Sequence, residues 1–510
     1  MMASLMDKYG IAFYGNLKKL AAPVNWKLFE ESYDFSNDFY QQKGVVGNSN
    51  ARAKFNPSSR WGIKERETLH ESPFDLKEGI DTTRHTTMTY PPGYYLIAGK
   101  FAGLFRPFKI TLVSYQHLIR YSGLLFFLFY LVMCWKLFAL LISGKSKYFS
   151  FLAVALHPMV VFLFSATNND LGLLAFGAAF LYLIALVALQ GWNSLRFFSS
   201  ALAGAAATLS KANGIIFSLC FLAILAAYQL YQRKIKSIFS TIGLAVIVTL
   251  LHFLFVWIAG DLKLNGETHP VTLLKCLKII STPFSMFKSY FGCFCWYEIS
   301  FSNWVYAFYY SLIIFITFNL FFSMRRSKQE ERLNPNHLVN LVLFLGSCLF
   351  ILSMYSAQFF LMKKVGFILQ GRYFLPTLLV LYLWIGVYFE KLSSSHNKLK
   401  KMNLVTIQKT ILIFLIILSN YALLLVIKRH YMSPGDKLRF LFNSSYMEMI
   451  LNRMMQYKPE YLKSDFVFTI VWTSYILSQI GMCIIISLFD RNFLKIQHKN
   501  KTDFSLYVPR

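Results

Sequence analysis

Residues 168–190 read NNDLGLLAFGAAFLYLIALVALQ, two amides and an acid followed by an uncharged, largely apolar run. An apolar run of about 20 residues is long enough to cross a bilayer as one α-helix. We expect about eleven such spans, at residues 121–142, 148–166, 170–190, 197–210, 212–230, 238–259, 304–323, 338–361, 374–389, 410–427 and 466–488. A lipid-exposed backbone must satisfy its hydrogen bonds within its own segment. The expected fold is therefore all-α, a polytopic membrane helical bundle.

The composition agrees with a membrane protein and explains the strong positive charge. Of the 510 residues, 56% are hydrophobic and 18% aromatic, the mean hydropathy is +0.45 and the formal net charge is +28. Many Lys and Arg residues gather in loops between the expected spans, as they do in cytoplasmic loops of membrane proteins. These loops hold Lys145–Lys147, Arg233–Lys236, Arg325-Arg326 and Lys398–Lys401. The charge thus indicates orientation in the membrane, and we expect no nucleic-acid partner.

Three regions are expected along the chain. Residues 1–117 form an extracytoplasmic N-terminal region, 118–489 the transmembrane bundle, and 490–510 a basic cytoplasmic tail. Within the first region, Leu96–Phe105 is too short to span and suits an interfacial helix with Tyr94 and Tyr95 at headgroup level. Residues 1–117 can reach the extracytoplasmic side in two ways. Either a further span precedes them, or the N-terminal tail crosses the membrane together with the first span.

The polar clusters between spans all fall on one side of the membrane when the spans are threaded in order. They are Asn168–Asp170, Lys211, the loop 292–303 and Gln370–Tyr373. Asp170 could bind a polar substrate or a metal, while Lys211 and Arg372 could bind phosphate, Arg372 through its planar fork beside a glycine. Purely structural roles stay open for each: an Asn and Asp that cap a helix, a lysine that snorkels, and an arginine that anchors at the interface.

Other chemistry has less support. Acids in the N-terminal region, Glu30, Glu31, Asp34 and Asp38, are candidate bases or solvated surface charges, and Asp81 and His85 are further candidates. The sequence shows no Ser-His-Asp spacing, Walker loop or dinucleotide fingerprint. Cys293 and Cys295 lack the second ligand pair that zinc needs. We expect no certain cofactor and assign no metal ligands, although a divalent metal is compatible with the site.

The order of the motifs resembles the GT-C superfamily of polyprenyl-phosphate-sugar-dependent membrane glycosyltransferases, and is similar to protein mannosyltransferases and lipid A aminoarabinose transferase-like proteins. The resemblance covers residues from about 85 to 430 and lies in the order of short motifs. They are Pro91-Pro92-Gly93-Tyr94-Tyr95, Asn169-Asp170, Ser210-Lys211, Ser289–Glu298 and Gly371-Arg372-Tyr373. The family's first span and its acidic pair after that span have no clear counterpart here.

The resemblance implies transfer of a sugar from a polyprenyl-phosphate carrier to an acceptor hydroxyl on the extracytoplasmic face. Asp34 or Asp38 would be the catalytic base, and Lys211 and Arg372 would bind the donor phosphate. The residues expected to line the substrate cavity are Tyr90, Tyr94, Asn169, Asp170, Trp296, Glu298 and Tyr373.

The partners implied by the resemblance are the lipid-linked donor, membrane lipid, and a glycan, lipid or protein acceptor. The expected location is a bacterial inner membrane rather than the endoplasmic reticulum. The alternative function is a transporter or flippase of a lipid-linked or anionic solute, which would use the same cations without a general base.

Overall fold

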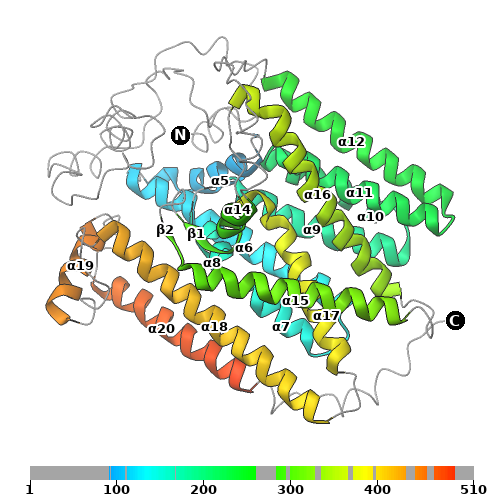
Figure 1. Ribbon diagram of the computed structural model, residues 1–510. Helices are drawn as coiled ribbons and strands as arrows, with labels where there is room; N and C mark the ends of the chain where they lie inside the picture. The colour runs from blue at the N-terminus through cyan, green and yellow to red at the C-terminus, as the bar shows by residue number, and fades with distance from the viewer. Residues whose placement is uncertain are drawn as a thin grey trace, which may run out of the picture.

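The computed structural model describes residues 91, 93–108, 112–166, 168–259, 283–294, 299–327, 335–365, 371–393, 398–431, 443–456 and 465–488. These residues form a helical bundle with one small hairpin (Figure 1). In chain order the elements are α5 Gly93–Gly103, η3 Arg106–Phe108, α6 Leu112–Leu141, α7 Ser146–Ala155, α8 Pro158–Phe164, α9 Asp170–Gln190, α10 Ser194–Ser210, α11 Asn213–Tyr231, α12 Ile235–Ala259, α14 Pro283–Gly292, β1 Cys293–Phe294, β2 Ile299–Ser300, α15 Asn303–Ser327, α16 Pro335–Val365, η4 Gly371–Thr377, α17 Leu378–Ser393, α18 Lys398–Tyr431, α19 Ser444–Gln456 and α20 Asp465–Leu488.

Helix α9 lies at the centre of the bundle. It packs against α6, α10, α11 and α16, and 78% of its most apolar stretch is buried. Small residues such as Gly172 and Gly177 let neighbouring side chains approach its backbone, as in other membrane helix interfaces. A helix that is apolar on every side must be enclosed by protein or lipid. The central position of α9 therefore fixes where its polar N-terminus, Asp170, meets the rest of the protein.

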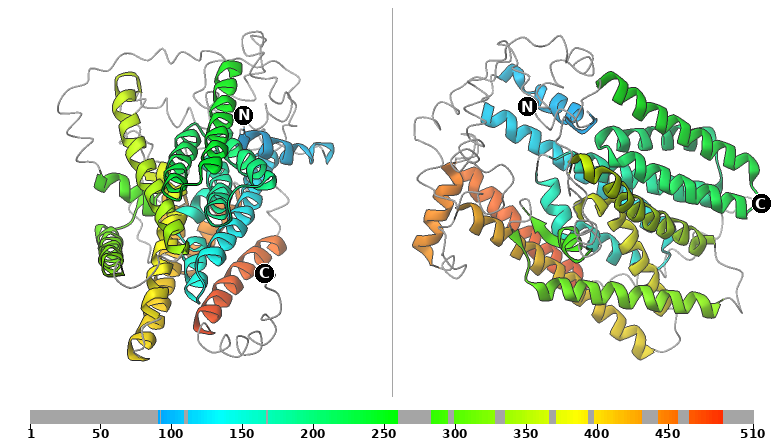
Figure 2. Two further views of the ribbon diagram at one scale, coloured as in Figure 1. Left: turned by 90° about the vertical axis from the view of Figure 1, so that its right-hand side faces the viewer. Right: turned by 45° about the horizontal axis from the view of Figure 1, so that its top comes forward.

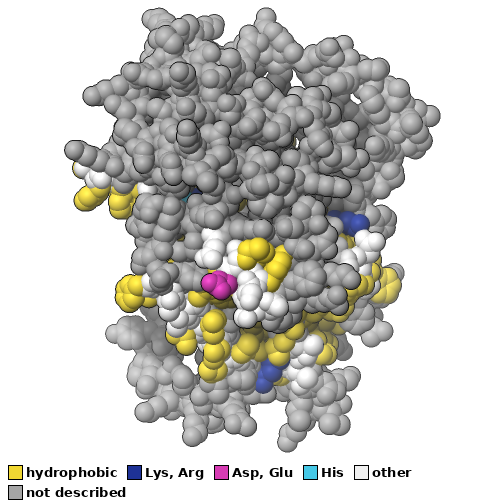
Figure 3. Space-filling view, turned by 90° about the vertical axis from the view of Figure 1, so that its left-hand side faces the viewer, with side chains coloured by type: hydrophobic (Ala, Val, Ile, Leu, Met, Phe, Trp, Pro, Cys, Tyr) yellow, Lys and Arg dark blue, Asp and Glu magenta, His cyan; other side chains and the backbone are white. Residues whose placement is uncertain are grey.

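The outer helices turn large apolar side chains away from the protein. Only 22% of the apolar stretch of α12 is buried, and only 6% of that of α20. The two helices lie at opposite edges of the bundle, α12 next to α11 and α20 along α18 (Figures 1 and 2). Hydrophobic side chains also dominate the described part of the face seen in Figure 3, where charged ones are sparse. Such surfaces fit the lipid of a membrane, and the chain is a multi-pass membrane protein.

Fewer helices than expected qualify as spans. Among the described residues, eight helices are long and apolar enough to cross a membrane, or up to nine if the bent pair α7 and α8 is one span. The expected count of about eleven is not confirmed. Two expected spans are not among the eight. Residues 197–210 lie in α10, which has 17 residues, and residues 304–323 lie in α15.

The expected span at 148–166 is broken in the middle. Helices α7 and α8 meet at an angle of 51°, where Pro158 begins α8. Proline has no backbone N–H to continue the hydrogen bonding of a preceding helix, which explains the break. The hydroxyl of Ser419 in α18 donates to the Leu156 carbonyl at a distance of 2.6 Å. A long-range contact thus satisfies a carbonyl at this break.

Helix α5 forms where a short interfacial helix was expected, and its two tyrosines are buried within the protein. Tyr94 is fully buried and Tyr95 is 9% exposed. The Tyr94 ring lies 5.4 Å from that of Phe126 in α6. Helix α5 packs against α6, α9 and α10 with its aromatic side turned inward. The expected headgroup depth of this pair stays a prediction.

The segment after α14 is held by a tyrosine rather than by a long sheet. Strands β1 and β2 pair antiparallel, with Cys293 opposite Ser300 and Phe294 opposite Ile299. The hydroxyl of Tyr306 donates to the Gly292 carbonyl at 2.6 Å and accepts from the Phe301 N–H at 2.9 Å. These bonds fix the end of α14 against the start of α15, and α14 in turn packs on η4.

The expected orientation gives a test of topology. We predict that 324–337 and 390–409 lie in the cytoplasm while the loop 292–303 lies outside. Ser327 and Asn303 are the two ends of α15, whose 25 residues extend about 37 Å. Single cysteines at these positions, in a background without the native thiols, should be labelled from opposite sides by a membrane-impermeant reagent. Labelling of both from one side would contradict this topology.

Candidate functional site

An acid opens the central helix and is buried. Asp170 is the first residue of α9, and its side chain is 3% exposed. Its backbone N–H donates to the Asn168 side-chain oxygen at 3.0 Å, whereas Asn169, the residue just before the helix, makes no capping bond. The expected amide cap is therefore supplied by Asn168. A carboxylate in the first turn is also stabilised by the positive end of the helix dipole.

Lys211 occupies the connection between α10 and α11, and its ammonium donates to an oxygen of Asp170. The Lys211 nitrogen also lies 4.2 Å from the centre of the Tyr373 ring, within reach of a cation–π interaction. The side chain is only 10% exposed, so it does not snorkel to water. Burial lowers the pKa of Lys211 to about 8, against the opposing effect of the Asp170 carboxylate. The adjacent Asp170 carboxylate favours the charged ammonium.

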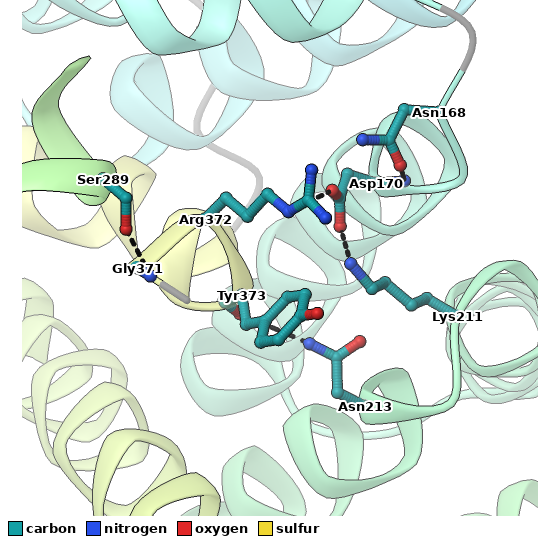
Figure 4. A network of polar contacts seen from close by, with 8 residues as sticks. All are labelled: Asn168, Asp170, Lys211, Asn213, Ser289, Gly371, Arg372 and Tyr373. Atoms are coloured by element: carbon teal, nitrogen blue, oxygen red, sulfur yellow. Dashed lines mark hydrogen bonds and ion pairs between the residues drawn. The ribbon is translucent and has the colours of Figure 1, made fainter. Parts of the chain in front are cut away.

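Arg372 reaches the same acid from another part of the chain. It lies in η4, and its Nε is 3.7 Å from the second carboxylate oxygen of Asp170. The backbone N–H of the preceding Gly371 donates to the Ser289 hydroxyl of α14 at 2.6 Å. Figure 4 shows Asp170 between the two cations, with Tyr373 beside Lys211. Helix α14 thus holds the backbone from which the Arg372 side chain extends.

The three charged groups, which we call the Asp170 cluster (Asp170, Lys211 and Arg372), favour an anionic ligand. Within the cluster itself, two cations surround one carboxylate in a largely buried place. Buried cations need anions or strong hydrogen bonds. Lysine supplies a point charge, and arginine can offer two parallel N–H groups to phosphate oxygens. The arrangement is therefore suited to a phosphate group.

The structure brings together several residues that the sequence predicted for the site. Lys211 and Arg372 converge on one carboxylate, and Tyr373 joins them. Asn169, which precedes Asp170 in the chain, is buried, and so is Tyr94 of α5. Their role in a substrate cavity stays a prediction. Five predicted site positions lie outside the described residues: Asp34, Asp38, Tyr90, Trp296 and Glu298. The other candidates of the N-terminal region, Glu30, Glu31, Asp81 and His85, lie outside them as well.

Three supporting residues were not predicted as site residues. Besides Asn168 and Ser289, the side-chain amide of Asn213 contacts the Tyr373 carbonyl at 3.4 Å. Asn168 and Ser289 each begin a motif named above, Asn168–Asp170 and Ser289–Glu298, and Asn213 lies two residues after Lys211. The motifs therefore pointed to these positions. The sequence did not show which segments contact one another in the folded protein.

The described residues were expected to supply no metal ligands. Within the part of the chain that the structure describes, no group of three or more His, Cys, Asp or Glu side chains could hold a metal ion. Asp170 is occupied by Lys211 and Arg372 instead.

A glycine beside Lys211 gives a stability prediction. A Cβ at Gly214 would clash with the Ala207 carbonyl oxygen and lie 2.7 Å from its carbonyl carbon, because α10 and α11 approach closely here. Overpacking of this kind costs about 1–3 kcal/mol. Gly214→Ala should lower the thermal unfolding midpoint of the purified protein. At the matched control Gly243 in α12, nothing lies within 4 Å, so Gly243→Ala should not lower it. Equal effects of both changes would contradict the prediction.

The comparisons identify the family. Residues 35–381 match the family described as predicted membrane protein (DUF2142). The chain belongs to the DUF2142 family. The match includes α5 to η4 and so contains the whole Asp170 cluster. A comparison with curated proteins found no match.

Solved structures similar to this DUF2142 protein include two of ArnT from Cupriavidus metallidurans, one bound to undecaprenyl phosphate and one in the apo state. The first is 13% identical and the second 14%, each with a TM-score of 0.38. The similarity covers 72% of this chain and spans 65% of the length of each ArnT chain.

Proposed function

We propose that this DUF2142 protein is an integral membrane glycosyltransferase of GT-C type. It moves a hexose or pentose from a polyprenyl-phosphate carrier to an acceptor hydroxyl on the extracytoplasmic face. One observation carries the proposal: Lys211 and Arg372, which are far apart in the sequence, both contact Asp170. The order of sequence motifs that resembles the GT-C superfamily supports the same function. The membrane proposed is a bacterial inner membrane.

The proposed reaction uses the two cations at the leaving group. The bond between the sugar's anomeric carbon and a phosphate oxygen breaks, while the acceptor oxygen forms a new bond to that carbon. Negative charge develops on the departing polyprenyl phosphate, where Lys211 and Arg372 stabilise it in a buried place. The acceptor hydroxyl loses its proton to a carboxylate acting as general base, for which we propose Asp34 or Asp38.

The direct test follows the sugar and the carrier separately. Purified full-length protein in nanodiscs would be incubated with polyprenyl-phosphate hexoses and pentoses and a membrane extract as the source of acceptor. We expect free polyprenyl phosphate to appear together with a glycosylated product, both detected by mass spectrometry. In proteoliposomes, movement of the intact donor across the bilayer without cleavage would instead support the transporter.

A further inference from the structure

We propose that Asp170 is an internal substitute for the donor phosphate. In the resting protein it holds Lys211 and Arg372 in place, and the phosphate of the lipid carrier displaces it on binding. The proposal rests on the proposed function and adds an autoinhibitory contact to the same site. It assigns Asp170 a positioning role for the cations rather than a role at the reacting atoms.

The contacts of Asp170 show that it satisfies the two cations unequally. One carboxylate oxygen accepts from Lys211, but the other is 3.7 Å from Arg372 Nε, beyond the roughly 2.8 Å of a charge-assisted hydrogen bond. That second oxygen is buried and accepts no hydrogen bond from the described residues. A phosphate, with more oxygens arranged in three dimensions, can bond both cations at once. The site is therefore held together by an anion that a phosphate can outcompete.

Both cations are more exposed than the carboxylate between them. Side-chain exposure is 3% for Asp170, 10% for Lys211 and 18% for Arg372. The displaced carboxylate stays in the first turn of α9, where the helix dipole stabilises it. The neighbouring Asn169 has a buried side-chain nitrogen that donates no hydrogen bond to described residues. That nitrogen is a further donor for the displaced acid or the phosphate.

This exchange has a thermodynamic consequence. When only a fraction of the protein is in a state that can bind, the apparent affinity is the intrinsic affinity multiplied by that fraction. Removing the charge of Asp170 removes the competitor while leaving both cations. Asp170→Asn should therefore bind a polyprenyl phosphate more tightly than the natural protein, by about tenfold or more. A carboxylate that helps to bind the donor would instead give weaker binding, and the carboxylate spectrum described below shows whether Asp170 itself moves.

The experiment compares undecaprenyl phosphate with undecaprenol as probes on the full-length protein in nanodiscs. We expect Asp170→Asn to tighten binding of the phosphate only, and to show a larger ligand-induced rise in unfolding temperature than the natural protein. Lys211→Met should lose the phosphate-specific binding. Arg196→Ala is the matched control, because Arg196 bonds Gln190 and Gly191 at the opposite end of α9. Unchanged or weaker phosphate binding by folded Asp170→Asn overturns the proposal.

A second measurement keeps the proposal testable if Asp170→Asn does not fold. In the natural protein labelled with ¹³C-aspartate, undecaprenyl phosphate should shift an aspartate carboxylate band in the infrared difference spectrum, and undecaprenol should not. Binding without such a shift overturns the exchange. Phosphate-specific binding that requires Lys211 but ignores Asp170 leaves the proposed function standing and removes only the exchange. No phosphate-specific binding by either protein overturns both.

Discussion

Lys211→Ala should lower the rate of single-turnover sugar transfer by about 100-fold or more. A preorganised hydrogen-bond donor in a buried site accelerates a reaction by about that factor, because it stabilises the charge of the transition state. Arg372→Ala should have an effect of similar size. The two effects should not add in Lys211→Ala/Arg372→Ala, because both side chains contact the same carboxylate and are proposed to bind one phosphate. The rate is measured by rapid quench from an enzyme preloaded with polyprenyl-phosphate sugar.

Folding must be separated from chemistry in this experiment. Removing Lys211 leaves Asp170 with Arg372 alone, and a buried charge that loses a partner destabilises the protein. Lys136→Ala and Arg196→Ala are matched controls, because both remove a cation far from Asp170. The Lys136 nitrogen lies 5.8 Å from the ring of Tyr182, well along α9 from Asp170, and Arg196 is the control described above. Both controls should transfer sugar normally. A folded Lys211→Ala protein with near-normal transfer would remove Lys211 from the proposed mechanism.

Asp34→Asn or Asp38→Asn should reduce single-turnover transfer by about 100-fold to 10,000-fold, the usual contribution of a general base. The change keeps size and hydrogen bonding while it removes the proton-accepting charge. Donor binding should be unaffected, since the proposed phosphate ligands are Lys211 and Arg372. Glu30→Gln and Glu31→Gln are comparison variants from the same segment, for which we expect smaller effects.

Near-normal transfer by both aspartate variants would place the base elsewhere. Asp81 is the next candidate because it precedes the Pro-Pro segment in the same region. Asp170 follows, since its contacts with Lys211 and Arg372 already give it another role. If no acid affects transfer and the lipid-linked solute crosses the bilayer intact, the transporter is the better account.

Local sequence determined the class of fold and the position of several site residues along their helices. The uncharged run after Asp170 could only be stable as a helix inside protein or lipid, and the acid had to lie at its start. Lys211 likewise had to lie between two apolar helices, and Arg372 just before another. These are consequences of charge and hydrophobic length, which are properties of short segments.

Tertiary structure decided which of these side chains meet. Nothing within residues 168–190 indicates that Asp170 contacts Lys211 rather than water, or that Arg372 reaches the same carboxylate. The inward packing of Tyr94 in α5 was equally hidden from the sequence. A segment's composition fixes its preference for membrane or water. The direction of each side chain depends on how neighbouring helices pack, and close approaches such as that at Gly214 set this packing across the whole bundle.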